Sequence, residues 1–198
     1  PDPKKGQGYP RSYDILKYIA YLGFQITAYT TCQETDTDEH LLSELQQLGI
    51  EIVRNNLDFK KFITSRKNLY DVAFISRPHN AAKYMDDIKS NNKAKIIYDA
   101  EAIYANRELL QAELVDGAKL SDKVKDRHRA KEFAITKSAD IICVVSDYEK
   151  SFFDKYNTPE TKILGFQHLV KFTEKSYDER KDILFVGAIV NESKYNPN

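Results

Sequence analysis

Short apolar runs alternate with amphipathic stretches along most of this 198-residue chain, and this alternation limits the fold more than any other feature. The runs at 96–98 and 141–145 are continuously apolar, which is typical of strands buried on both faces of a parallel sheet. Between such runs, apolar residues recur at helical spacing, as Leu41, Leu45 and Leu48 do. Strands that alternate with helices predict an α/β fold in which helices cover both faces of the sheet.

The order of these segments predicts a doubly wound, mostly parallel, Rossmann-like sheet, because right-handed crossovers place helices on both faces. Residues 1–12 are rich in Gly and Pro and are predicted to form a loop. Gly23 and Gly49 stand where helices are expected to end. Strands are predicted at 25–29, 51–53, 71–77, 96–98, 140–145 and 161–166, and helices at 15–22, 41–48, 59–67, 81–90 and 147–156, with one or two more within 104–138.

Composition excludes some classes of protein. Lys plus Arg and Asp plus Glu both number 30, and a formal net charge of zero argues against a nucleic-acid partner held by phosphate neutralisation. No apolar run reaches the roughly 18 residues of a membrane-spanning helix, and no signal peptide is recognised. The two cysteines, Cys32 and Cys143, do not form a pair with zinc-ligand spacing. We therefore expect a cytoplasmic protein with no metal and no cofactor.

The strongest candidate site lies just after the apolar run at 96–98, where Asp99 and Glu101 stand two residues apart. If the strand continues, both side chains point to one face. The carboxyl end of a parallel strand, ahead of a helix, is where open α/β sheets bind ligands. His79 follows the preceding predicted strand and falls on the same edge, although a lone His is more often structural or exposed. Capping of the next helix by Asp99 or Glu101 remains the alternative.

Glycines near the start of the chain suggest a second candidate. Gly6 and Gly8 precede Arg11 and a predicted helix, and glycines let backbone amides approach a phosphate at a helix N-terminus. The dinucleotide-binding pattern G-x-G-x-x-G is not met, because residue 11 is Arg, so a nicotinamide enzyme is not favoured. Asp36 and Asp38 have a D-x-D spacing that some sugar transferases use for a metal, but helix capping explains them more simply.

Two further segments have an interpretation in terms of helices alone. Ser146 and Glu149 have the spacing of a capping box, which we favour over a ligand contact, although a capped helix N-terminus can also face a phosphate. The many charged residues of 119–132 are predicted to form the solvated face of a helix.

Several motifs together resemble a known family. They occur in one order along the chain: Tyr98-Asp99-Ala100-Glu101 with Tyr104 and Arg107-Glu108, then Ser138-Ala139-Asp140, then Val144-Val145-Ser146-Asp147-Tyr148-Glu149, and Phe185-Val186-Gly187 ahead of Asn196-Pro197-Asn198. This series resembles the N-terminal half of a family 4 glycosyltransferase of the two-Rossmann-domain (GT-B) kind. The loop from Gly6 to Arg11 resembles that family's glycine-rich loop.

The resemblance implies a hexosyltransferase-like enzyme that transfers a sugar, with retention, from a nucleotide-sugar donor to a glycan or lipid-linked acceptor, without a metal. The N-terminal domain of such enzymes mainly shapes the acceptor side. By this analogy Asp99 and Glu101 orient or deprotonate the acceptor hydroxyl. The implied substrate contacts are Gly6, Gly8 and Arg11 toward phosphates, Arg77, His79 and Arg107 toward the acceptor, and Ser146.

The resemblance also divides the chain into an acceptor-side domain (1–166), a linker (167–181) and the first strand of a donor domain (182–198). The fragment alone is expected to be inactive, with nucleotide-sugar affinity no tighter than about millimolar. Asp99→Asn is expected to lower kcat with little loss of stability, because Asp99 should lie in a cleft. A sugar-nucleotide epimerase and a noncatalytic binding module remain alternatives, and a homodimer and a peripheral membrane contact are left open.

One strand is missing from the predicted sheet. In the doubly wound order the first strand is central, and this chain begins in the loop that should follow it. The strands at 25–29 and 71–77 are therefore each expected to have an unpaired edge. Residues 183–186, which are apolar and follow the linker, are predicted to fill the slot from the same chain or a swapped neighbour.

Overall fold

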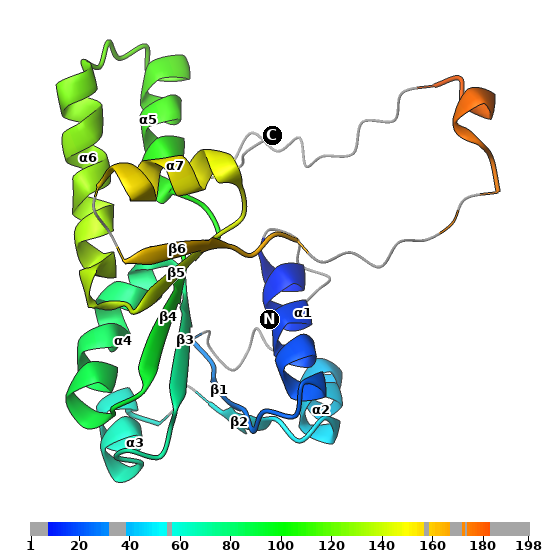
Figure 1. Cartoon of the computed structure of the whole chain (residues 1–198), viewed down its shortest axis with the longest axis vertical. Helices are drawn as coiled ribbons and strands as arrows, with labels where there is room; N and C mark the ends of the chain where they lie inside the picture. The colour runs from blue at the N-terminus through cyan, green and yellow to red at the C-terminus, as the bar shows by residue number, and fades with distance from the viewer. Residues whose placement is uncertain are drawn as a thin grey trace.

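The computed structural model describes residues 8–31, 39–54, 57–156, 159–166, 172 and 174–182. Within them the chain is an α/β protein, with parallel strands surrounded by helices (Figure 1). The predicted Rossmann-like class is thus confirmed. The strands are β1 (Thr27–Tyr29), β2 (Glu51–Val53), β3 (Val72–Ser76), β4 (Lys95–Asp99), β5 (Ile141–Val144) and β6 (Glu160–Ile163). The helices are α1 (Tyr9–Tyr21), α2 (Glu39–Gln47), α3 (Phe59–Ser65), α4 (Pro78–Asn91), α5 (Tyr104–Leu114), α6 (Asp122–Ile135) and α7 (Asp147–Lys155), with 3-10 turns η3 (Thr136–Ser138) and η4 (Tyr177–Glu179).

The strands form two parallel sheets, a pair β1-β2 and a larger sheet β3-β4-β5-β6. Over the described residues β1 pairs only with β2, and β3 pairs only with β4. The predicted interruption between the strands at 25–29 and 71–77 is therefore present. Residues 183–186, the segment predicted to fill it, lie outside the described residues.

Two apolar clusters hold the sheets. The larger one lies between β3, β4 and β5 and the helices α3, α4, α6 and α7, and contains the fully buried Tyr98, Ile142 and Phe153. The smaller one joins α1 and α2 to β1 and β2 around Leu45. Tyr29 of β1 packs its ring against aromatic rings of α3 and α4, so the small sheet reaches the larger cluster by side-chain packing.

Two helices begin earlier than predicted, each at a proline. The predicted loop 1–12 is wrong for its last residues, because α1 already begins at Tyr9, with Gly8 as its N-cap and Pro10 in its first turn. Likewise α4 begins at Pro78 and not at Ala81. Proline has no N–H, and the first-turn N–H groups of a helix have no partner within it, so proline is well tolerated there. The result brings Gly8 and Arg11 to the N-terminus of a helix.

Candidate functional site

The carboxyl ends of β3 and β4 and the N-terminus of α1 bring four predicted site residues into two ion pairs. Asp99 is the last residue of β4, and Arg77 follows the last residue of β3. Arg11 pairs with Asp99, and Arg77 pairs with Glu101. We call Arg11 and Asp99 the inner pair, and Arg77 and Glu101 the outer pair.

The inner pair is buried. The terminal nitrogens of Arg11 donate to both Asp99 oxygens, at 2.5 Å and 2.8 Å, and its Nη2 also donates to the carbonyl oxygen of Leu164 at 2.8 Å. Ser76 Oγ donates to the same carboxylate at 3.2 Å. Both charged side chains are almost completely shielded, with 2% and 1% of their surface exposed. The expectation that Asp99 lies open in a cleft is therefore wrong.

The neighbour of the inner pair in β5, Cys143, has a raised thiol pKa. Cys143 stands beside Asp99 in the sheet. Burial, and to a lesser extent the Asp99 charge, raises the pKa of the Cys143 thiol to about 11. The thiol is therefore protonated at neutral pH and, as predicted, is a buried part of the protein interior.

The outer pair lies nearer the surface. Arg77 Nε donates to Glu101 Oε2 at 2.8 Å, and the side chains are 17% and 10% exposed. The guanidinium stacks over the Tyr9 ring, 5.2 Å from its centroid. Gly8 lies against this pair, and a Cβ at that position would overlap the Glu101 carboxylate, which would then have to shift. Both members of the pair have positive φ, 78° for Arg77 and 57° for Glu101, which non-glycine residues rarely adopt.

Positive φ at Glu101 also means that β4 does not continue past Asp99. The two carboxylates therefore differ in depth and partner, although sequence spacing treated them alike. Neither carboxylate caps α5 within the described part of the chain. The N–H groups at the start of that helix are bound instead by Glu132, which accepts from Tyr104 at 3.2 Å and Ala105 at 2.7 Å.

Glu132 is the residue that the sequence interpretation missed. The segment 119–132 was predicted to be a solvated face, yet Glu132 is 8% exposed. Burial raises its pKa, while its hydrogen bonds to the backbone act in the opposite direction. A carboxylate at the buried end of a charged helix leaves no local signal, because its partners lie 27 and 28 residues away in sequence.

The remaining predicted residues lie around the outer pair or in a helix cap. His79 lies in the first turn of α4 and is exposed as a whole residue. Partial desolvation of its ring, followed by the nearby Arg77 charge, lowers its pKa. Arg107 is exposed and lies over the Tyr104 ring, 5.5 Å from its centroid. Burial is the main cause of a raised Tyr104 pKa, and the charges of Arg77, Glu101 and Arg107 all act on it.

Ser146 acts as a helix cap, as the sequence indicated. Its Oγ accepts from the Glu149 N–H at 3.3 Å at the start of α7. The Glu149 carboxylate binds the N–H of Val145 at 3.3 Å and of Ile103 at 3.2 Å, and so ties α7 to the loop after β4. A contact between Ser146 and a ligand stays a prediction.

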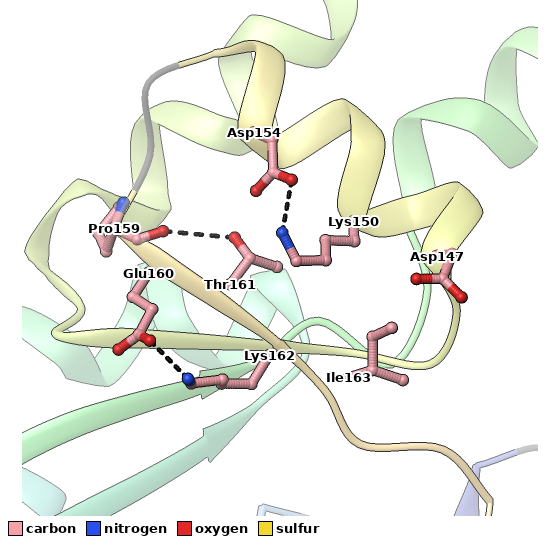
Figure 2. A pocket seen from close by; sticks show the side chains of 8 residues that line it. All are labelled: Asp147, Lys150, Asp154, Pro159, Glu160, Thr161, Lys162 and Ile163. Carbon is pink, nitrogen blue, oxygen red and sulfur yellow. Dashed lines mark hydrogen bonds and ion pairs between the residues drawn. The ribbon is translucent and has the colours of Figure 1, made fainter.

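A separate hollow of about 580 Å³ lies between α7 and β6 (Figure 2). Its two lysines are already paired, Lys150 with Asp154 at 2.5 Å and Lys162 with Glu160 at 2.5 Å. None of the predicted site residues lines it. The lining residues are Asp147, Lys150, Asp154, Pro159, Glu160, Thr161, Lys162 and Ile163.

Other predicted features lie outside the described residues, among them Gly6, Asp36 and Asp38. Across the ranges that the structure describes, no cluster of three or more His, Cys, Asp and Glu residues has the geometry to hold a metal ion. No helix in those same ranges combines the length and apolar character needed to cross a bilayer. Comparison of the chain with family models, with curated proteins and with solved structures found no match.

Proposed function

We propose that this chain is the acceptor-side domain of a nucleotide-sugar-dependent glycosyltransferase. The ordered series of motifs that resembles family 4 enzymes supports this proposal, and the Rossmann-like fold is compatible with it. Fold alone does not define an activity, so the proposal depends on the site.

The observation that carries the proposal is the composition of the edge around the outer pair. Two tyrosine rings, Tyr9 and Tyr104, lie with Arg77 and Glu101 at the carboxyl end of the larger sheet. Ligand sites commonly combine aromatic surface with a few fixed polar groups. A sugar ring has apolar faces that pack on tyrosine and hydroxyl groups that a carboxylate and a guanidinium bind.

The two pairs then have different roles. Asp99 already accepts three hydrogen bonds and is buried, so we assign it to positioning, where it holds the first turn of α1 against β4. Glu101 is 10% exposed, against 1% for Asp99, and pairs with Arg77 through Oε2, so of the two it is the carboxylate that we assign to orienting an acceptor hydroxyl. The donor nucleotide-sugar would be held mainly by a second domain.

Saccharide binding to the chain tests the proposal. In ¹⁵N-labelled protein, titration with a panel of mono- and oligosaccharides should shift the backbone signals of Tyr9, Arg77, His79, Glu101 and Tyr104. Nucleotide-sugars should bind no tighter than about millimolar. Tyr104→Ala should abolish the saccharide shifts, whereas Tyr148→Ala, which alters an exposed tyrosine of α7, should not.

Two results would overturn this assignment. Saccharide shifts confined to the hollow between α7 and β6 would move the site elsewhere. Micromolar binding of nucleotide-sugars to this chain alone would contradict the proposed division of labour between domains.

A further inference from the structure

Arg77 uses only part of its hydrogen-bonding capacity. A guanidinium has five N–H donors, and within the described residues Arg77 uses one of them, Nε, which donates to Glu101. The four donors on its two terminal nitrogens have no partner among the residues that the structure describes. Arg11, by contrast, commits both terminal nitrogens to Asp99 and Leu164. The two terminal nitrogens of Arg77 can therefore still donate two parallel hydrogen bonds to a carboxylate or a phosphate.

The surroundings of Arg77 are close to neutral and partly shielded from water. The inner pair is internally neutral, and the charges that act at Tyr104 are two cations, Arg77 and Arg107, and two carboxylates, Glu101 and Glu132. The Tyr9 ring lies over the Arg77 guanidinium and excludes water from that side. Partial desolvation strengthens a charge-assisted hydrogen bond relative to one in open water.

The backbone at Arg77 also suggests selection for the side chain. With φ at 78° and ψ at 145°, the residue occupies a region that is essentially restricted to glycine. An arginine in such a conformation is strained. A purely structural turn between β3 and α4 would be better formed by glycine, so the side chain is the feature that offsets this strain.

We propose that the terminal nitrogens of Arg77 bind an oxyanion carried by the acceptor sugar, either the carboxylate of a uronic acid or a phosphate group. This inference rests on the proposed function and narrows its substrate class to acidic acceptors. Glu101 holds Arg77 by its Nε and competes with the incoming anion for the same positive charge, while the terminal nitrogens stay available.

Binding of matched sugars tests the proposal. Glucose, glucuronate and glucose 6-phosphate are titrated into the whole chain at constant ionic strength, and calorimetry or NMR supplies the affinities. Glucuronate or glucose 6-phosphate should bind at least about tenfold more tightly than glucose, which is the scale of one charge-assisted hydrogen-bonded contact. The better of the two anions identifies the source of the oxyanion.

The two members of the outer pair should respond in opposite directions. Arg77→Gln should remove the preference for the anionic sugar. Arg77→Lys keeps the charge but cannot donate two parallel hydrogen bonds, so it should reduce that preference. Glu101→Gln keeps the shape and removes the competing charge. It should raise the affinity for the anionic sugar relative to that for glucose severalfold, even where the lost hydroxyl contact weakens both. Arg54→Gln, at an exposed arginine paired with Glu39, should leave all affinities unchanged.

The outcomes separate this inference from the proposed function. Equal affinity for glucose and the anionic sugars at the same edge would overturn the role of Arg77, while the proposed function as an acceptor-side domain would be unaffected. A purely structural ion pair predicts that Arg77→Gln and Glu101→Gln each weaken the binding of glucose and of the anionic sugars to the same extent, which would also overturn the inference. Inorganic phosphate that binds as tightly as glucose 6-phosphate would support the Arg77 site and count against a sugar acceptor.

Discussion

Breaking the inner pair should cost more stability than breaking an exposed ion pair, and Asp99→Asn tests this. The substitution keeps the shape of the side chain but leaves the Arg11 guanidinium buried without a countercharge. Loss of one partner of a buried ion pair costs about 3–5 kcal/mol. Asparagine retains one acceptor oxygen for Arg11 or Ser76, so we expect the lower end, about 3 kcal/mol.

That loss is large for a chain of this size. Total stability is about 5–15 kcal/mol, and each kcal/mol shifts the melting temperature of a 150–250-residue protein by about 2–4 °C. We therefore expect Asp99→Asn to melt about 6–12 °C lower than the parent chain. Because Arg11 links α1 to both β4 and the chain after β6, hydrogen exchange should accelerate first in α1.

Urea unfolding followed by circular dichroism measures the change. The matched control is Glu51→Gln, which removes the charge from an exposed Arg66 pair with similar distances and should cost less than about 1 kcal/mol. In the double variant Arg11→Met with Asp99→Asn, the loss should be smaller than the sum of the single losses. An Asp99→Asn chain within about 1 kcal/mol of the parent, or strictly additive losses, would refute the reasoning.

Three further predictions concern single positions. Gly8→Ala should displace the Glu101 carboxylate and cost about 1–3 kcal/mol in urea unfolding, and an unchanged stability would contradict the crowding. Cys143 should resist iodoacetamide at pH 8 in the native chain and react after unfolding, as peptide mass mapping will detect. The Arg66 hydrogen bond lowers the pKa of Glu51 from 4.5 to about 2, so its contribution is complete above 4.5 and is lost as the pH falls toward 2. The stability difference between the parent and Glu51→Gln should shrink toward zero as the pH falls from 4.5 to 2. A difference that does not change with pH would contradict a stabilising Glu51–Arg66 pair.

The positions of the buried strands along the sequence were predictable, because a buried parallel strand leaves a continuous apolar run. The runs at 96–98 and 141–145 correspond to β4 and β5, which are central in the larger sheet. The strand predicted at 25–29 is shorter, because β1 begins only at Thr27. Pattern alone was least reliable where helices begin, because Pro10 and Pro78 resemble loop residues until the first turn of a helix is considered.

The interruption of the sheet was also predictable, because it follows from strand count and not from local pattern. A doubly wound sheet changes direction at a central strand, so the strands on either side of that position are not paired with each other. In the described part of the structure these two strands are β1 and β3. What occupies the space between them stays a prediction, as do the domain boundaries at 166 and 181.

The two carboxylates of the candidate site show where sequence reasoning reaches its limit. Asp99 and Glu101 are chemically alike and two residues apart, and only their partners distinguish them. The partner of Asp99 lies 88 residues away, whereas that of Glu101 lies 24 residues away. Asp99 is enclosed by a buried arginine, which suits a structural role, whereas Glu101 lies slightly nearer the surface, where the proposed acceptor site needs a carboxylate. Chemical role here is a property of long-range pairing, and a single sequence carries no record of which arginine approaches which acid.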